Sequence, residues 1–187
     1  LERRSESGGG SDGGAASIHD IEAGVRLDEK PPLDSEDRAL VLERVLPRGV
    51  QAGDYARGAY WPVFSWARRR CECTVANRTG GLEIECVAEG GREGLSKRIR
   101  FEPDGRITLS YAWDTSIADP EDLFAPEFSI AGDLELQYTP PADEWRYAIE
   151  TVAKSERGLD RTRQGESVTL RWPVRLGKAT IEITPAG

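Results

Sequence analysis

Three neighbouring segments decide the fold: FAPEFSI at residues 124–130, IETVAKSERG at residues 149–158 and QGESVTLRWPV at residues 164–174. In the first and last segments apolar and polar side chains alternate, which is the pattern of a β-strand with one buried face. The middle segment is rich in turn residues. The stretch therefore predicts strands separated by a polar connection.

The composition limits the class of protein. The 187 residues are 38% hydrophobic and 31% charged, which suits one large domain whose sheets each have a solvent-exposed face. The formal net charge of −8 opposes binding to nucleic acid. No apolar run approaches the length that spans a bilayer, and the first 16 residues lack the apolar centre of a signal peptide. We therefore expect no nucleic-acid or membrane partner and a cytoplasmic location.

The chain divides into three parts. Residues 1–16 are glycine, serine and charge, so we expect a flexible linker. Residues 17–58 are expected to form a connecting segment with a short N-terminal helix over about residues 34–46. Asp34 and Ser35 can cap this helix, and Pro47 ends it. Residues 59–187 are expected to form the β-sandwich domain.

Short alternating segments dominate the chain from residue 59. The clearest hairpin joins residues 95–101 to residues 107–113 through Glu102-Pro103-Asp104-Gly105, a turn that proline and glycine favour. A second hairpin is expected around Thr79-Gly80-Gly81. Ten or more strands with closely spaced turns predict an all-β, antiparallel sandwich.

Three cysteines, Cys71, Cys73 and Cys86, are too few for a disulfide framework. The favoured interpretation is three small buried side chains in a reducing compartment. If the chain turns at Thr79-Gly80, Cys73 faces Cys86 and a disulfide becomes feasible. A zinc site would need a fourth ligand, and the single histidine, His19, is distant in sequence. We expect no metal site and no cofactor.

The strand motifs carry a family resemblance. Phe124 with Glu127, the Glu150-Thr151-Val152 segment with Ser155 and Gly158, and Gln164-Gly165 with Trp172-Pro173 resemble the C-terminal β-sandwich domain of α-amylases and 4-α-glucanotransferases of glycoside hydrolase family 57. Ser17-Ile18-His19-Asp20 is similar to the segment that joins the family's catalytic barrel to this domain. The resemblance covers most of the chain after residue 16.

The resemblance implies a twisted antiparallel supersandwich similar to the galactose-mutarotase fold. It also implies that the catalytic carboxylates belong to an N-terminal barrel, and no alternating β–α pattern for a barrel occurs here. We therefore assign no catalytic residue. The chain departs from the family where Glu43-Arg44-Val45 replaces an aspartate-histidine-phenylalanine run, which argues against a site at that position.

Two groups of polar residues are candidate carbohydrate contacts. Glu127 lies in an otherwise apolar strand, so it either contacts sugar hydroxyls on a concave face or pairs with an arginine such as Arg98 or Arg100. His19 and Asp20 either form a hydrogen-bonded pair beside a substrate cleft or have a structural role. A histidine acts as a general base only when a partner holds it in the right geometry.

Five tryptophans offer faces on which sugar rings can stack. Trp113 and Trp172 alternate in phase with apolar neighbours and are expected in the core. Trp61, Trp66 and Trp145 are less clearly internal and are the candidate stacking residues.

Three functions remain open. The first is a non-catalytic C-terminal accessory domain of an α-glucan-acting enzyme, which packs on the catalytic barrel and contacts glucan. The second is a free-standing carbohydrate-binding module. The third is a small sugar epimerase of mutarotase type, which would need a free carboxylate in a pocket. For the first, we expect an exposed apolar docking face, through which the isolated chain could also form a homodimer.

Overall fold

The computed structural model describes residues 39–67, 69–88, 94–155 and 158–186. The expected linker at residues 1–16, the connecting residues 17–38 and the candidates His19 and Asp20 lie outside this description. The described elements, in chain order, are β1 (Val41–Leu46), α2 (Ala52–Ala56), β2 (Phe64–Ser65), β3 (Cys71–Arg78), β4 (Gly81–Ala88), β5 (Leu95–Phe101), β6 (Ile107–Trp113), β7 (Leu123–Ile130), β8 (Leu134–Thr139), β9 (Asp143–Ser155), β10 (Gly158–Pro173), the 3-10 helix η1 (Val174–Leu176) and β11 (Lys178–Pro185).

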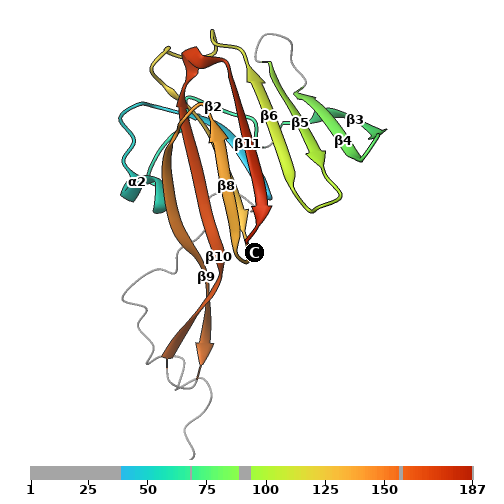
Figure 1. Ribbon diagram of the computed structural model, residues 1–187. Coiled ribbons are helices and arrows are strands. Elements are labelled where there is room, and N and C mark those ends of the chain that lie inside the picture. The colour runs from blue at the N-terminus through green and yellow to red at the C-terminus, as the bar shows by residue number, and fades with distance from the viewer. Residues whose placement is uncertain (1–38, 68, 89–93, 156–157, 187) are drawn as a thin grey trace, which may run out of the picture.

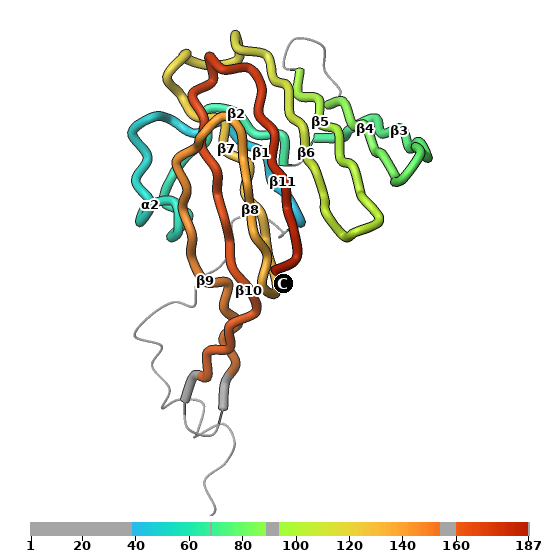
Figure 2. Tube along the Cα trace, in the orientation of Figure 1, coloured from blue at the N-terminus to red at the C-terminus, as the bar shows by residue number. Residues whose placement is uncertain are grey.

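The strands form two antiparallel sheets, as the sequence predicted. Sheet A has the strand order β2-β1-β7-β10-β9, and sheet B has the order β3-β4-β5-β6-β11-β8. The two sheets lie face to face, and the far ends of β9 and β10 extend below both of them (Figure 1). The Cα trace in Figure 2 shows this long pair twisting as it leaves the body of the domain. The all-β prediction is confirmed.

The core lies between the sheets. Phe124 of β7 is fully buried and stacks on Trp113 of β6, with ring centroids 4.1 Å apart. Trp172 of β10 pairs with Phe124 in the strand register, and the centroids of the two rings are 6.4 Å apart. The indole N–H groups of Trp113 and Trp172 donate to the carbonyls of Val174 and Pro140, so neither tryptophan leaves a buried donor unsatisfied. The core positions predicted for both tryptophans are confirmed.

The two predicted hairpins are present. Phe101 pairs with Ile107 around the turn at Glu102–Gly105, and Gly105 has a φ of +86°, which glycine adopts without strain. Arg78 pairs with Gly81, which leaves Thr79-Gly80 as a two-residue turn.

The second hairpin corrects the favoured interpretation of the cysteines. The register of β3 and β4 places Cys73 opposite Cys86, and their sulfur atoms form a disulfide. Cys71 is a free, exposed thiol and not a small buried side chain. The alternative that the sequence left open, a bridge across this hairpin, is therefore the one that the structure contains.

The predicted helix over residues 34–46 is wrong in the part that the structure describes, because residues 41–46 form β1. The apolar side chains of this segment fit a helical face, but they also fit a central strand with both faces covered. Strand β1 lies between β2 and β7, so the sandwich begins before the predicted boundary at residue 59. The short α-helix among the described residues is α2, which follows β1.

No helix in the described parts of the chain is both long enough and apolar enough to cross a membrane.

Candidate functional site

Glu127 lies at the centre of a polar cluster on the outer face of sheet A. Along β7, Phe124, Phe128 and Ile130 point into the core, and the alternation of the strand directs Glu127 to the opposite face. Only 6% of Glu127 is exposed, because the segment that contains α2 covers this face. A buried carboxylate of this kind must be paired or neutralised.

Four side chains satisfy the carboxylate of Glu127. The Arg44 guanidinium and the Tyr55 hydroxyl donate to Oε2 at 2.8 and 2.7 Å. The hydroxyls of Tyr147 and Ser167 donate to Oε1 at 2.6 and 2.7 Å. Each oxygen therefore accepts two hydrogen bonds, so the carboxylate is held in place on both sides.

The strand order explains how these residues meet. Arg44, Glu127, Ser167 and Tyr147 come from β1, β7, β10 and β9, which are consecutive neighbours in sheet A. Arg44 and Ser167 reach Glu127 diagonally from the two strands that flank β7, as same-face neighbours can, and Tyr147 reaches it from one strand further. Tyr55 is the buried residue of α2, and its hydroxyl also accepts a hydrogen bond from Arg44 at 3.0 Å.

The cluster keeps Glu127 ionised. Burial alone would raise the pKa of Glu127, but the hydrogen bonds from Tyr147, Ser167 and Tyr55 and the charge of Arg44 outweigh it and lower the pKa below its ordinary value. Burial raises the pKa of the Tyr55 hydroxyl, and the negative charge of Glu127 raises it further, so Tyr55 remains a donor. The arrangement suits a fixed anion and not a proton acceptor.

The arginine partner of Glu127 differs from the expected ones. Arg98 and Arg100 lie on sheet B, where they pair with Glu85 and Glu102. The partner is Arg44, in the segment that the sequence led us to treat as a helix without a site. The signal that could have identified it is the pair of adjacent charges, Glu43-Arg44, inside an otherwise apolar segment.

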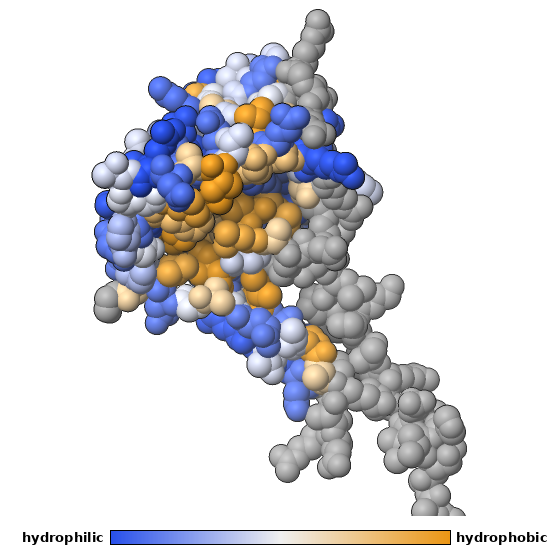
Figure 3. Space-filling view, turned by 90° about the vertical axis from the view of Figure 1, so that its right-hand side faces the viewer, coloured by the Kyte–Doolittle hydropathy of each residue, from blue (hydrophilic) through white to orange (hydrophobic). Residues whose placement is uncertain are grey.

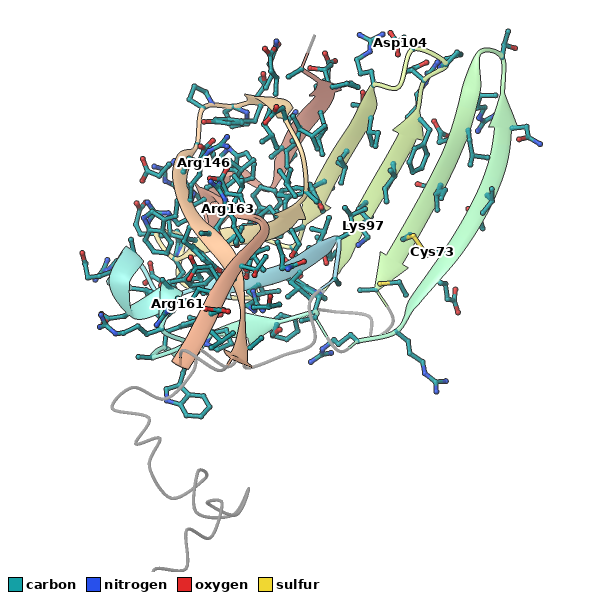
Figure 4. All side chains as sticks on the ribbon, turned by 90° about the horizontal axis from the view of Figure 1, so that it is seen from below. Cys73, Lys97, Asp104, Arg146, Arg161 and Arg163 are labelled. Carbon is teal, nitrogen blue, oxygen red and sulfur yellow. A yellow bond between two sulfur atoms is a disulfide. The ribbon has the colours of Figure 1, made fainter. Side chains whose placement is uncertain are left out.

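Glu43 and Arg44 point to opposite faces of β1. Glu43 faces the interior, where Lys97 of β5 donates to its Oε1 at 2.7 Å and the Tyr111 hydroxyl donates to the same atom at 3.3 Å. Figure 4 shows Lys97 extending from β5 toward β1. Burial and the neighbouring Glu43 charge raise the pKa of Tyr111. Two adjacent charged residues are therefore buried, and each has an ion-pair partner.

An aromatic cluster adjoins the Glu127 site. The ring of Tyr55 stacks on Tyr60 with centroids 4.6 Å apart and lies 5.4 Å from the ring of Trp145. The guanidinium of Arg171 lies 3.7 Å from the centre of the Trp145 ring, a cation–π contact. Trp61, next to Tyr60 in sequence, is 88% exposed.

The structure separates the predicted stacking residues. Trp145 and Glu127 both contact Tyr55 and so belong to one site. Trp61 is exposed on the segment that covers this face. Trp66 is only 3% exposed and meets Phe64 and Phe124 edge-on in the core, so it has no free face for a sugar ring. The sequence interpretation of Trp66 as a stacking residue is wrong.

A separate cleft of about 430 Å³ lies where β9 and β10 leave the sandwich. Three of its charged lining residues are already paired, because Glu166 forms ion pairs with Arg146 at 2.8 Å and Arg163 at 3.4 Å. In the described part of the chain, no three His, Cys, Asp or Glu side chains gather as metal ligands.

Comparison with known proteins agrees with this fold. Residues 129–184 match the family described as alpha-amylase/4-alpha-glucanotransferase, C-terminal. The chain resembles the C-terminal domain of these enzymes. The resemblance predicted from the sequence is therefore confirmed.

Individual relatives match over most of the chain. An α-amylase of Pyrococcus abyssi is 23% identical over 193 residues, which include 91% of this chain and 29% of that enzyme. A 4-α-glucanotransferase of Thermococcus kodakarensis is 26% identical over 185 residues, 86% of this chain and 28% of that enzyme. The chain thus spans less than a third of the length of either relative.

A solved structure has the same fold. The crystal structure of 4-α-glucanotransferase from Thermococcus litoralis superposes with a TM-score of 0.60 at 17% identity. The superposition covers 82% of this chain and 28% of that one.

Proposed function

We propose that this chain is the non-catalytic C-terminal accessory domain of an α-glucan-acting enzyme of the α-amylase or 4-α-glucanotransferase type in glycoside hydrolase family 57. The supporting observation is that most of the chain aligns with 28–29% of such enzymes, over a region whose family description is C-terminal. The part of each relative that this chain does not match is long enough to contain a catalytic barrel, which would be the partner of this domain. The domain would pack on that barrel and stabilise it.

The geometry of Glu127 favours this role over an epimerase. A mutarotase-type reaction needs a carboxylate that can accept a proton from a sugar hydroxyl. In Glu127 both oxygens already accept two hydrogen bonds, and the pKa is lowered. The cluster therefore holds α2 rigidly against sheet A.

An apolar hollow supports a docking role. Strands β4 and β5 turn Leu82, Ile84 and Ile99 toward the interior, and on edge strand β3 the side chain of Val75 is 65% exposed on the same face. Figure 3 shows this apolar surface hollowed between the two sheets and rimmed by polar residues. Apolar surface of this kind marks a site of interaction. We propose that the catalytic barrel packs here.

A second candidate function is direct contact with glucan, whether in a full enzyme or in a free-standing carbohydrate-binding module. The observation in its favour is the exposed ring of Trp61 beside the aromatic cluster of Tyr55, Tyr60 and Trp145. Sugar rings stack on such faces, and the paired polar groups around Glu127 would hold the cluster rigid.

Calorimetric titration of the 187-residue chain with maltoheptaose, together with a glucan hydrolysis and disproportionation assay, tests both proposals. Binding without turnover would support a glucan-contacting accessory domain. The absence of both would leave docking and stabilisation as the role and would reject the glucan contact. Turnover by this chain would overturn the non-catalytic assignment.

The cytoplasmic location expected from the sequence stays a prediction. The state of the Cys73–Cys86 pair in the cell bears on it, because disulfides are rare in reducing compartments except in hyperthermophiles. Alkylation of the protein at the moment of cell lysis decides the question. Three reactive thiols would indicate a reducing compartment, whereas labelling of Cys71 alone would indicate an oxidising one.

A further inference from the structure

Strand β3 is an edge of sheet B in the part of the chain that the structure describes, and it has little of the usual protection. It pairs with β4 over all eight of its residues without a register shift, and its other side has no neighbour among the described strands of the sheet. Proteins usually block such edges with charged side chains, especially lysine, with proline, with a bulge or with a covering segment. The sequence of β3, CECTVANR, contains no proline, lysine or glycine, and its two charged residues, Glu72 and Arg78, lie near its ends. The hairpin stands at the side of the molecule in Figure 1, with β3 outermost.

The turn determines which backbone groups of β3 are free. A two-residue hairpin closes on a hydrogen-bonded pair, here Arg78 and Gly81. Hydrogen-bonded and non-bonded pairs then alternate, so the even-numbered residues of β3 bond to β4. The N–H and C=O groups of Cys73, Val75 and Asn77 consequently point to the free edge.

We propose that β3 pairs with β3 of a second copy of this chain, antiparallel and centred on Val75. In this register Val75 lies opposite the partner's Val75, and Cys73 lies opposite the partner's Asn77. Every outward-pointing backbone group in the overlap then meets a complementary one. The contact is isologous and closes after two copies, as a two-fold interface must.

The charges of β3 suit this register. Glu72 and Arg78 are equidistant from Val75, so each Glu72 lies opposite the partner's Arg78, and the interface contains this pair twice. Opposite charges in directly opposed strand positions stabilise a sheet. Within the described residues Arg78 has a weak contact with Glu83 at 3.4 Å, and no ion pair involves Glu72. A register shifted by two residues would lose both pairs.

The pairing also extends the apolar surface. Val75 is 65% exposed in the single chain, and it faces the same side as the hollow that Figure 3 shows. Side chains opposed on antiparallel strands share a face. The two valines would therefore cover each other, and the apolar inner faces of the two copies would become continuous.

Sedimentation velocity of the chain over a range of concentrations tests the proposal. A Cys71→Ser background prevents dimers through the exposed thiol. We expect a monomer–dimer equilibrium that Val75→Asp weakens about tenfold or more, because it opposes two like charges at the two-fold axis. The matched control is Val63→Asp, at a valine that is 44% exposed but outside β3, and it should leave the dimer intact.

Charge reversal tests the register itself. Glu72→Arg or Arg78→Glu alone should weaken the dimer, since each opposes like charges twice. An equimolar mixture of the two variants should form heterodimers, because one copy is then positive and the other negative at both positions. Both opposed pairs of the heterodimer therefore join opposite charges, one in the native sense and one reversed. The double variant, in which both changes are present in each copy, should dimerise through two complementary pairs. Loss of the Arg78–Glu83 contact cannot explain recovery in the double variant, since the Arg78→Glu change is present there as well as in the single variant.

Three results would overturn the proposal. The first is a monomer at all concentrations, and the second is a dimer that Val75→Asp does not weaken. The third is a double charge-reversal variant that stays monomeric while circular dichroism shows it to be folded.

Discussion

The guanidinium of Arg44 lies 2.8 Å from the carboxylate of Glu127, although the two residues are 83 positions apart in the chain. Both side chains are more than 90% buried, at 4% and 8% relative exposure. This ion pair joins β1 to β7 on the face of sheet A that α2 covers. It connects the first described strand to the segment that shows the family resemblance, and two expectations follow from it.

Replacement of Arg44 should strongly lower the stability of the fold. Arg44→Met leaves Glu127 buried without its counter-charge, and such a loss typically lowers the free energy of unfolding by about 3–5 kcal/mol. Urea denaturation followed by tryptophan fluorescence measures it. The control is Arg57→Met, whose ion pair with Asp54 is largely exposed and should be worth less than about 1 kcal/mol. Equal effects of the two changes would contradict the importance of the buried pair.

The stability should depend on pH through Glu127. Its folded-state pKa is lowered relative to the ordinary value of 4.5, so the folded state binds the proton less readily than the unfolded state. The stabilisation is fully present above pH 4.5 and is lost as the pH falls through the lowered folded pKa. The stability difference between the wild type and Glu127→Gln should therefore shrink in acid. A difference that is constant from neutral pH to about pH 3 would refute this account.

Gly165 should not tolerate a side chain. The register of β9 and β10 shifts between Arg163 and Gly165, and a Cβ at residue 165 would lie 2.3 Å from the carbonyl oxygen of Ile130. Gly165→Ala should lower the free energy of unfolding by about 1–3 kcal/mol, as forced backbone shifts do. Gly49→Ala, where no atom lies within 4 Å, is the matched control and should be nearly neutral. A thermal melt in which both variants match the wild type would disprove the steric argument.

Trp61 should contribute to glucan binding and not to the stability of the fold. Its side chain is 88% exposed, so Trp61→Ala should leave the melting temperature unchanged but weaken maltoheptaose binding about tenfold, as loss of a stacked ring does. Leu176→Ala, another exposed apolar side chain at 37%, should affect neither property. Binding to the Trp61 variant at wild-type affinity in calorimetry would remove this face from the proposed contact.

Local patterns in the sequence predicted much of the sandwich. Strand alternation identified β5, β6, β7 and the C-terminal part of β10, and the glycine turns identified the hairpins at Gly80 and Gly105. These features depend on the preferences of neighbouring residues, so a single sequence contains enough information. The same argument correctly placed Trp113 and Trp172 in the core. The described residues of the polar connection expected at residues 149–158 instead form the paired ends of β9 and β10.

The same patterns failed for β1 and for Trp66. Residues 41–46 have apolar side chains on both faces of the strand, and this pattern fits a helix equally well until the neighbouring β2 and β7 are known. Trp66 follows a strand of only two residues, so no alternation could indicate that its ring enters the core. In both cases the deciding contacts come from distant parts of the chain.

The sequence by itself determined the strand pattern, the turns and the family resemblance, because each depends on the spacing of residues along the chain. The tertiary structure decided that Arg44 neutralises Glu127, that Lys97 neutralises Glu43, and that Cys73 bonds to Cys86. With 33 acidic and 25 basic residues, the sequence permits many pairings, and composition cannot select among them. Burial selects them, since a charge removed from water is stable only beside the partner that the strand register places next to it.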